Sequence, residues 1–358
     1  MTEPLTLASR HLAQQRRIAA TTMAAALREW GLLDANHLRA SWSTVGPRLV
    51  TVLTAGQLAA ASGANDYVGA VAAAEDAEEA AFAVNPAAFA GVAADGRSLD
   101  TLVMRPLFTT FEAIRGGAST RQALGAGRGL LATIMRSEVA DAGRGAVGVG
   151  IAGRRTIQGY VRVVQPPACA RCVILAGKEF GWNKGFQRHP RCDCIHLPTT
   201  LIARNQNRGR LGSDSFTPTT QPGRGAAGFI NPRGYFDSLS RAEQDRIFTV
   251  DGARAIRDGA DMAQVINARR GMYTADAYAR RVAATREGTT RRGAFYRAER
   301  ARAEARTGTR FARDRIEARR GLPRFELRSP RLLPEEIYRL ATDREDAIRL
   351  LRRFGYLT

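Results

Sequence analysis

All four cysteines of this chain lie in one short stretch, Pro166–Pro198. They are Cys169, Cys172, Cys192 and Cys194, and their spacing is C-x2-C-x19-C-x-C. A Cys-x2-Cys turn can direct two thiolates at one metal ion, and a second pair at loop distance can complete a tetrahedral Zn2+ site. Four protein ligands leave no position open for a substrate water. The sequence therefore predicts a structural zinc rather than a catalytic one.

His189 stands shortly before the second pair and is the expected substitute if one thiol does not bind the metal. Three other interpretations stay open. The cysteines could be reduced and buried, as free cysteines often are. They could form disulfides, although the polar N-terminal segment has no apolar signal sequence that would favour this. One could be a nucleophile with His189 as its base, but clustered thiols favour a metal.

The order of motifs in this stretch resembles the phage Mu F-like minor head protein domain. A strand-like run leads into Cys-x2-Cys, then into Ala176-Gly177-Lys178-Glu179-Phe180, and then into His189-Pro190-Arg191-Cys192-Asp193-Cys194. The resemblance covers about Ile157 to Pro198, and the rest of the chain looks like the forms found in phages of actinobacterial hosts. It implies a minor capsid protein of a tailed phage head, assembled in the bacterial cytoplasm. It also implies portal and capsid proteins as partners in head morphogenesis.

The composition indicates a folded, strongly basic protein. The 358 residues are enough for two or three domains, and a hydrophobic content of 44% supports real cores. A formal charge of +20 and a pI near 11.1 predict an attraction to polyanions, either DNA or an acidic protein. The Ala-rich stretches are interrupted by charged residues and glycine, so no membrane association is expected.

Apolar residues recur at helical spacing throughout the first 150 residues, which predicts an N-terminal helical domain over 1–150. The expected helices are Ser9–Trp30, one capped by Asp34, a pair within 49–81 that Gly63 divides, one from Ser98 to Gly116, and one that the Ser119–Gln122 capping box starts. The Gly-rich residues 143–156 are predicted to form a hinge rather than a phosphate-binding loop, since the Lys-Ser/Thr of a P-loop is missing.

The remaining chain is predicted to form two further parts. A small α+β domain of the Mu F type, knuckle-like around the cysteines, should occupy 151–200, with a strand at 160–164. A basic, mostly helical region should follow over 201–358, with helix caps at Ser240–Glu243 and Thr342–Glu345. The fold class predicted for the whole chain is therefore mainly α.

Arginine is densest between residues 275 and 330. This pattern is typical of a surface that contacts double-stranded DNA without sequence preference, or of a solvated helix with Glu–Arg pairs at i,i+4. The candidate nucleic-acid-binding residues are Arg291, Arg292, Arg297, Arg300, Arg302, Arg306, Arg310, Arg313 and Arg315.

Two enzymatic alternatives also stay open. A capsid maturation protease would need a nucleophile, a base and an orienting acid, but only chance pairs such as Ser9 with His11 or Ser41 with His37 occur. An HNH-type nuclease would pair a zinc knuckle with a catalytic His, yet the chain has only Asn183 ahead of His189. No catalytic residue set emerges, so a structural protein is the preferred interpretation.

Overall fold

The computed structural model describes residues 3–164, 166–183, 185, 194–200 and 230–357. These residues belong to two compact units. The first unit comprises Met1–Pro167 and Leu175–Tyr235, and the second comprises Ala168–Ile174 and Phe236–Thr358. Both units are mainly helical, in agreement with the predicted fold class, and each contains a small antiparallel sheet. The domain boundaries expected at residues 150 and 200 stay a prediction.

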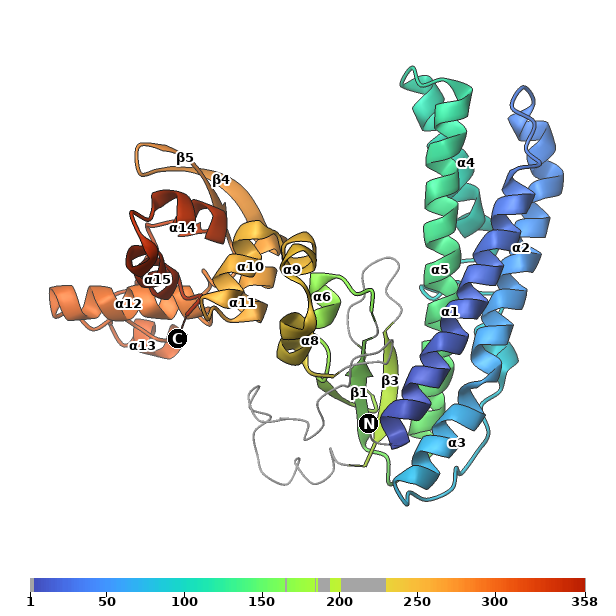
Figure 1. Cartoon of the computed structure of the whole chain (residues 1–358), viewed down its shortest axis with the longest axis horizontal. Helices are drawn as coiled ribbons and strands as arrows, with labels where there is room; N and C mark the ends of the chain where they lie inside the picture. Colours follow the sequence, from blue (N-terminus) through green and yellow to red (C-terminus); the bar gives the residue numbers. More distant parts are fainter. Residues whose placement is uncertain (1–2, 165, 184, 186–193, 201–229, 358) are drawn as a thin grey trace. The chain divides into compact units, whose positions relative to one another are not determined.

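The first unit begins with a bundle of long helices (Figure 1). The longest helix, α5, packs along three others, α1, α2 and α4. Its inner face and theirs bury a continuous apolar core that contains Leu49, Leu53, Leu131 and Met135. The helices of this unit are α1 (Glu3–Trp30), α2 (Leu38–Ser62), α3 (Ala64–Ala74), η1 (Pro86–Phe89), α4 (Leu99–Arg115) and α5 (Thr120–Ala152).

Local signals set most of these helix ends. The Ser98 side chain caps α4, and Ser119 with Gln122 forms the capping box of α5, as predicted. Gly63 separates α2 from α3, which also confirms the prediction. The start of α2 differs, because His37 rather than Asp34 is its N-cap. The helix expected after Asp34 and the one expected from residue 49 are also a single helix, which continues through Pro47.

The predicted hinge at 143–156 is wrong, because α5 continues through most of it to Ala152. The glycines there allow close packing. A Cβ at Gly143 would lie 2.5 Å from the Gln15 side chain, and one at Gly150 would lie 3.3 Å from Val68. A missing side chain therefore lets α1 and α3 approach α5. Glycine in a helix costs about 1 kcal/mol relative to alanine, which the closer packing offsets.

A three-stranded antiparallel sheet completes the described first unit. Its strands are β1 (Gly159–Val163), β2 (Glu179–Gly181) and β3 (Ile195–Thr199), in the order β2-β1-β3. In the register, Tyr160 pairs with Phe180 on one side and Pro198 on the other. The strand predicted at 160–164 is thus confirmed, shifted by one residue.

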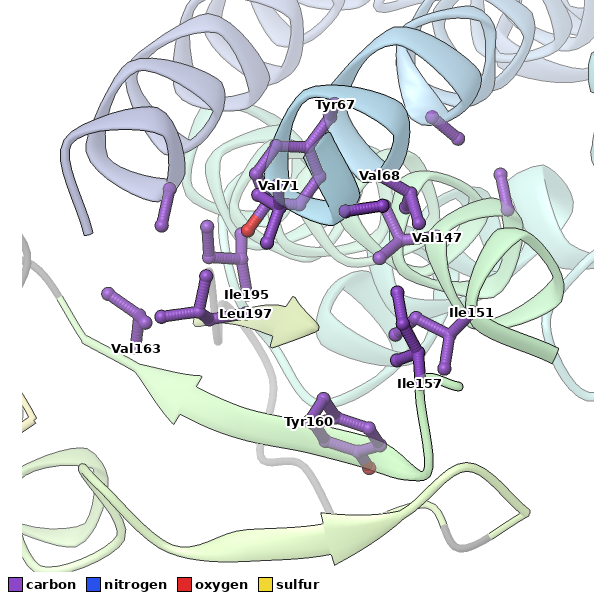
Figure 2. Packing of buried hydrophobic residues seen from close by; sticks show 14 of the residues in the cluster. Tyr67, Val68, Val71, Val147, Ile151, Ile157, Tyr160, Val163, Ile195 and Leu197 are labelled. Atoms are coloured by element: carbon purple, nitrogen blue, oxygen red, sulfur yellow. The ribbon is translucent and has the colours of Figure 1, made fainter. Parts of the chain in front are cut away.

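The sheet shares a hydrophobic core with the helices (Figure 2). Tyr160 and Val163 of β1 and Ile195 and Leu197 of β3 belong to the same buried cluster as residues of α1, α3 and α5. The helical members include Leu5, Leu12, Tyr67, Val68, Val71, Val147 and Ile151. The small sheet therefore has no separate core, and it depends on the bundle for its burial.

The second unit combines short helices with a second small sheet of order β4-β5-β6. Helix α8 (Pro232–Ser238) connects the two units along the chain. The other elements are α6 (Ala170–Val173), α9 (Arg241–Phe248), α10 (Val250–Arg257), α11 (Met262–Ala268), η2 (Arg269–Gly271), β4 (Met272–Ala277), β5 (Arg280–Thr285), α12 (Ala294–Thr307), α13 (Arg315–Arg319), β6 (Arg331–Leu332), α14 (Pro334–Leu340) and α15 (Arg344–Arg353).

The hairpin β4–β5 was not predicted. Its turn residues Tyr278 and Ala279 both have positive φ, 53° and 57°, where hairpins usually have Asn-Gly or Asp-Gly. The Ser240–Glu243 capping box is confirmed, whereas the last helix begins one residue later than expected, with Asp343 as its cap.

One arginine of the second unit is a core residue. The Arg331 guanidinium is fully buried and donates to the carbonyls of Phe354 and Glu287, at 2.8 and 2.9 Å, and to Gln264 Oε1 at 3.0 Å. Its guanidinium carbon also lies 4.3 Å from the centre of the Tyr356 ring. Part of the arginine excess therefore holds this unit together.

The packing of α5 predicts opposite effects for two neighbouring glycines. A Cβ at Gly127 would lie 2.6 Å from the Pro106 carbonyl and 2.7 Å from the Trp30 ring, whereas a Cβ at Gly125 would meet nothing within 4 Å. Gly127→Ala should lower the free energy of unfolding by about 1–3 kcal/mol through overpacking. Gly125→Ala should raise it by up to about 1 kcal/mol. Urea unfolding of both variants is the measurement, and equal effects would contradict this helix packing.

Candidate functional site

The structure places three of the predicted zinc ligands. Cys169 is exposed and directly precedes α6, and Cys172 is buried within that helix. Cys194 is buried immediately before β3. The other two candidates, His189 and Cys192, lie outside the described residues.

The described cysteines are divided between the two compact units. Cys169 and Cys172 belong to the second unit with α6, and Cys194 belongs to the first. Within the part of the chain that the structure describes, no three His, Cys, Asp or Glu side chains gather as metal ligands. The zinc site and its ligand set therefore stay a prediction.

Two buried arginines hold Cys194. Arg162, the fourth residue of β1, is only 1% exposed, and its Nη2 donates to Cys194 Sγ at 3.4 Å. Arg144 of α5 donates from Nη1 to the Cys194 carbonyl at 3.0 Å and from Nη2 to Asp141 Oδ1 at 2.5 Å. A guanidinium beside a sulfur stabilises its thiolate form, which is the form that binds zinc. The surroundings of Cys194 therefore fit a metal ligand.

Sequence reasoning missed both arginines, although β1 offered a signal. Arg162 lies within an apolar strand whose five residues are all buried. Arginine is rarely fully buried unless it has a partner, so an arginine in such a strand indicates a nearby acceptor or anion. The sequence offers no comparable signal for Arg144, because this residue lies in a helix rich in Gly and Ala rather than in a short run of apolar strand residues.

A cavity of about 360 Å³ lies beside this cluster in the first unit, between α1, α5 and β3. Its polar lining includes His11, Arg16, Arg136, Arg144 and His196. The Arg16 side chain donates to the Pro166 carbonyl at 2.9 Å. The cavity is therefore lined by basic groups as well as by the apolar parts of α1 and α5.

His11 is a packing residue. Its ring stacks on Tyr67 with centroids 4.0 Å apart, and burial lowers the pKa of His11 to about 4, so the ring is neutral at physiological pH. The Tyr67 hydroxyl donates to the His196 carbonyl at 2.9 Å, and the His196 ring stacks on Tyr160. These contacts connect α1 and α3 to both long strands.

The candidate nucleic-acid residues are spread over α12, α13 and the loops beside them. Several already have acidic partners: Arg300 lies 3.8 Å from Glu304, Arg302 lies 2.5 Å from Glu299, and Arg310 lies 2.8 Å from Glu317. Arg300–Glu304 is a helical pair with the predicted i,i+4 spacing, Arg302–Glu299 is an i,i+3 pair, and Arg310 reaches Glu317 from the loop between α12 and α13. DNA contact by the group stays a prediction.

Arg302 and Arg306 also line a cleft of the second unit, together with arginines outside the predicted set. The additional ones are Arg324, Arg328, Arg349, Arg352 and Arg353. The last three lie on α15, beyond the arginine-rich stretch 275–330 in which the candidates were sought. Arg324 and Arg328 lie within the arginine-rich stretch 275–330 but beyond the selected candidates, in a segment without regular secondary structure.

The chain matches the VG15 protein family over residues 3–209, more than half of its length, and it belongs to that family. The family is viral, which indicates a phage protein. Comparison with curated proteins and with solved structures gave no match. Among the described helices, none contains an apolar stretch long enough to cross a bilayer.

The cysteine segment predicts about one zinc ion per chain in the purified protein. Cys169→Ser should lose the metal, because a tetrahedral site cannot keep its affinity with one thiolate missing. His37→Ser is the control: His37 is an exposed histidine outside the segment, and its variant should keep the zinc. Elemental analysis of the three proteins is the measurement. A folded, metal-free wild type would contradict the prediction.

Proposed function

We propose that this protein is a structural minor head protein of a tailed phage, of the Mu F type. It is a component of the virion, assembled in the host cytoplasm, and it docks onto the portal or the inner face of the head shell through its N-terminal bundle. The cysteine segment holds a structural zinc in this proposal. The protein has no enzymatic role in this proposal.

The observation that carries the proposal is the extent of the family match. The viral family covers the helical bundle and the cysteine segment together, and the strands β1 and β3 share a hydrophobic core with the bundle. The strands β1 and β3, which precede and follow the cysteines in the sequence, are therefore built onto a long helical scaffold. A rigid scaffold of this kind offers extended helix faces to a larger assembly.

The bundle has a suitable docking face on α4. A groove of about 480 Å³ runs along this helix, and its lining includes Arg105, Phe108, Phe111 and Arg115. Phe108 is 53% exposed, and the Arg39 guanidinium lies 5.6 Å from the Phe111 ring centre. Exposed aromatic and arginine side chains are the residues that contribute most to protein interfaces.

The contacts of the Ser–His pairs give no reason to prefer a protease. Ser9 donates to the Leu5 carbonyl and Ser41 to the His37 carbonyl, at 2.9 and 3.0 Å, which are ordinary bonds within or beside a helix. His11 is stacked on Tyr67 away from solvent. For the nuclease alternative, the required histidine, His189, lies outside the described residues.

Phe108→Asp tests the docking face. If α4 contacts a head protein, a carboxylate at this position should reduce incorporation into particles by tenfold or more, because an interface aromatic contributes about 2 kcal/mol or more. The measurement is the amount of protein per purified particle, by quantitative mass spectrometry, after complementation of a phage that lacks the gene.

Ile316→Asp is the matched control, since Ile316 is also an exposed apolar residue, at 61%, but lies on α13 of the second unit. It should enter particles at the wild-type level. Normal incorporation of Phe108→Asp would show that α4 is not the docking face. Absence of the wild-type protein from particles would overturn the proposed function itself.

A further inference from the structure

The second unit contains a cleft of about 1070 Å³ with a strongly basic lining. Helices α12 and α15 and the segment 324–329 form its walls. Seven arginines line it against three glutamates, Glu299, Glu326 and Glu345. The arginines are Arg302, Arg306, Arg324, Arg328, Arg349, Arg352 and Arg353.

Most of these arginines have no acidic partner among the described residues. Arg302 pairs with Glu299 at 2.5 Å, and Arg349 pairs with Asp346. For the other five, no ion pair with a carboxylate exists within the described part of the chain. Four of them, Arg306, Arg324, Arg328 and Arg352, are exposed.

Like charges gathered around one concave surface repel each other, and the walls of a cleft strengthen their field. A bound anion relieves that repulsion. Each guanidinium offers a planar fork of donors that matches the oxygens of a phosphate group. Because the unpaired arginines come from three separate chain segments, a ligand with several successive negative charges fits this cleft better than a single small anion.

Aromatic rings lie among these charges. Phe311 and Phe325 both line the cleft, and their rings meet edge to face with centroids 5.5 Å apart. Tyr296 fixes this pair, since its hydroxyl donates to the Phe325 carbonyl at 2.8 Å and its ring contacts Phe325. Aromatic rings within a basic groove are the arrangement on which nucleic-acid bases stack, whatever their sequence.

We propose that this cleft binds the phosphodiester backbone of a nucleic acid without sequence preference. Arg306 and Arg352 on the two helices, with Arg324 and Arg328 between them in sequence, neutralise successive phosphates. The site thus extends the predicted arginine run to residues near the C-terminal helix. It is independent of the docking face on α4, because the two sites lie in different units.

The test uses the full-length protein and two fluorescent oligonucleotides, a 20-nucleotide oligothymidine and a duplex of equal length and arbitrary sequence. Fluorescence anisotropy at several salt concentrations gives the affinity and its salt dependence. Arg324→Gln/Arg328→Gln removes two charges from the cleft. Arg270→Gln/Arg281→Gln removes two charges from exposed positions of the same unit that do not line the cleft.

The cleft variant should bind about tenfold more weakly at low salt, and the slope of log affinity against log salt should fall by roughly 1.5 to 2, because two phosphate contacts are lost. The control variant should change affinity less than twofold. Tighter binding of oligothymidine would identify a single strand as the source of the phosphates, and tighter binding of the duplex would identify double-stranded DNA.

Two results would overturn the proposal. If both double variants lose affinity equally, only the net charge matters and the cleft is no site. If polyglutamate, at equal charge concentration, displaces the oligonucleotide as well as an unlabelled strand does, the cleft takes an acidic protein instead. Thermal unfolding of both variants, monitored by circular dichroism, verifies that they are folded.

Discussion

The sheet β2-β1-β3 depends on the bundle for its hydrophobic core. Three short strands are only marginally stable without a covered face, and here the covering side chains come from α1, α3 and α5. Polar bonds reinforce this packing, since Tyr67 donates to the main chain at His196 and Arg144 donates to the main chain at Cys194, both in or beside β3. The position of Cys194 is thus fixed by residues more than forty positions away in sequence.

This dependence makes the bundle and the strands β1 and β3 a single folded body. Removing residues 1–150 would expose the apolar face of the sheet, so the docking role of the bundle is better examined with surface variants than with truncation. The second unit uses its arginines in two ways. Arg331 is buried and ties β6 to the C-terminal turn. Four arginines of the cleft are instead exposed and form no ion pair with any described carboxylate: Arg306, Arg324, Arg328 and Arg352. A strongly basic composition alone does not distinguish these roles.

Sequence reasoning succeeded where the signal is local. Ser98 and Ser119 cap helices through their own side chains, so their roles can be read from three or four neighbouring residues. It failed where tertiary packing determines the residue type. The glycines of α5 suggested a hinge, but position 143 is a glycine because the Gln15 side chain packs against it and leaves no room for a Cβ. The β4–β5 turn lacks the usual glycine, and the cleft unites arginines from segments far apart in sequence. The cysteine spacing indicated metal ligands but could not reveal Arg162 beside Cys194.

The central claim is that the bundle and the sheet fold as one body. Native-state hydrogen exchange of the full-length protein, followed by mass spectrometry over a denaturant series, tests it most directly. If the shared core governs both parts, amides of β1 and of the α5 segment around Val147 and Ile151 should open with the same free energy and the same denaturant dependence. Exchange of β1 at much lower denaturant, while α5 stays protected, would contradict the claim and show that the sheet unfolds independently of its scaffold.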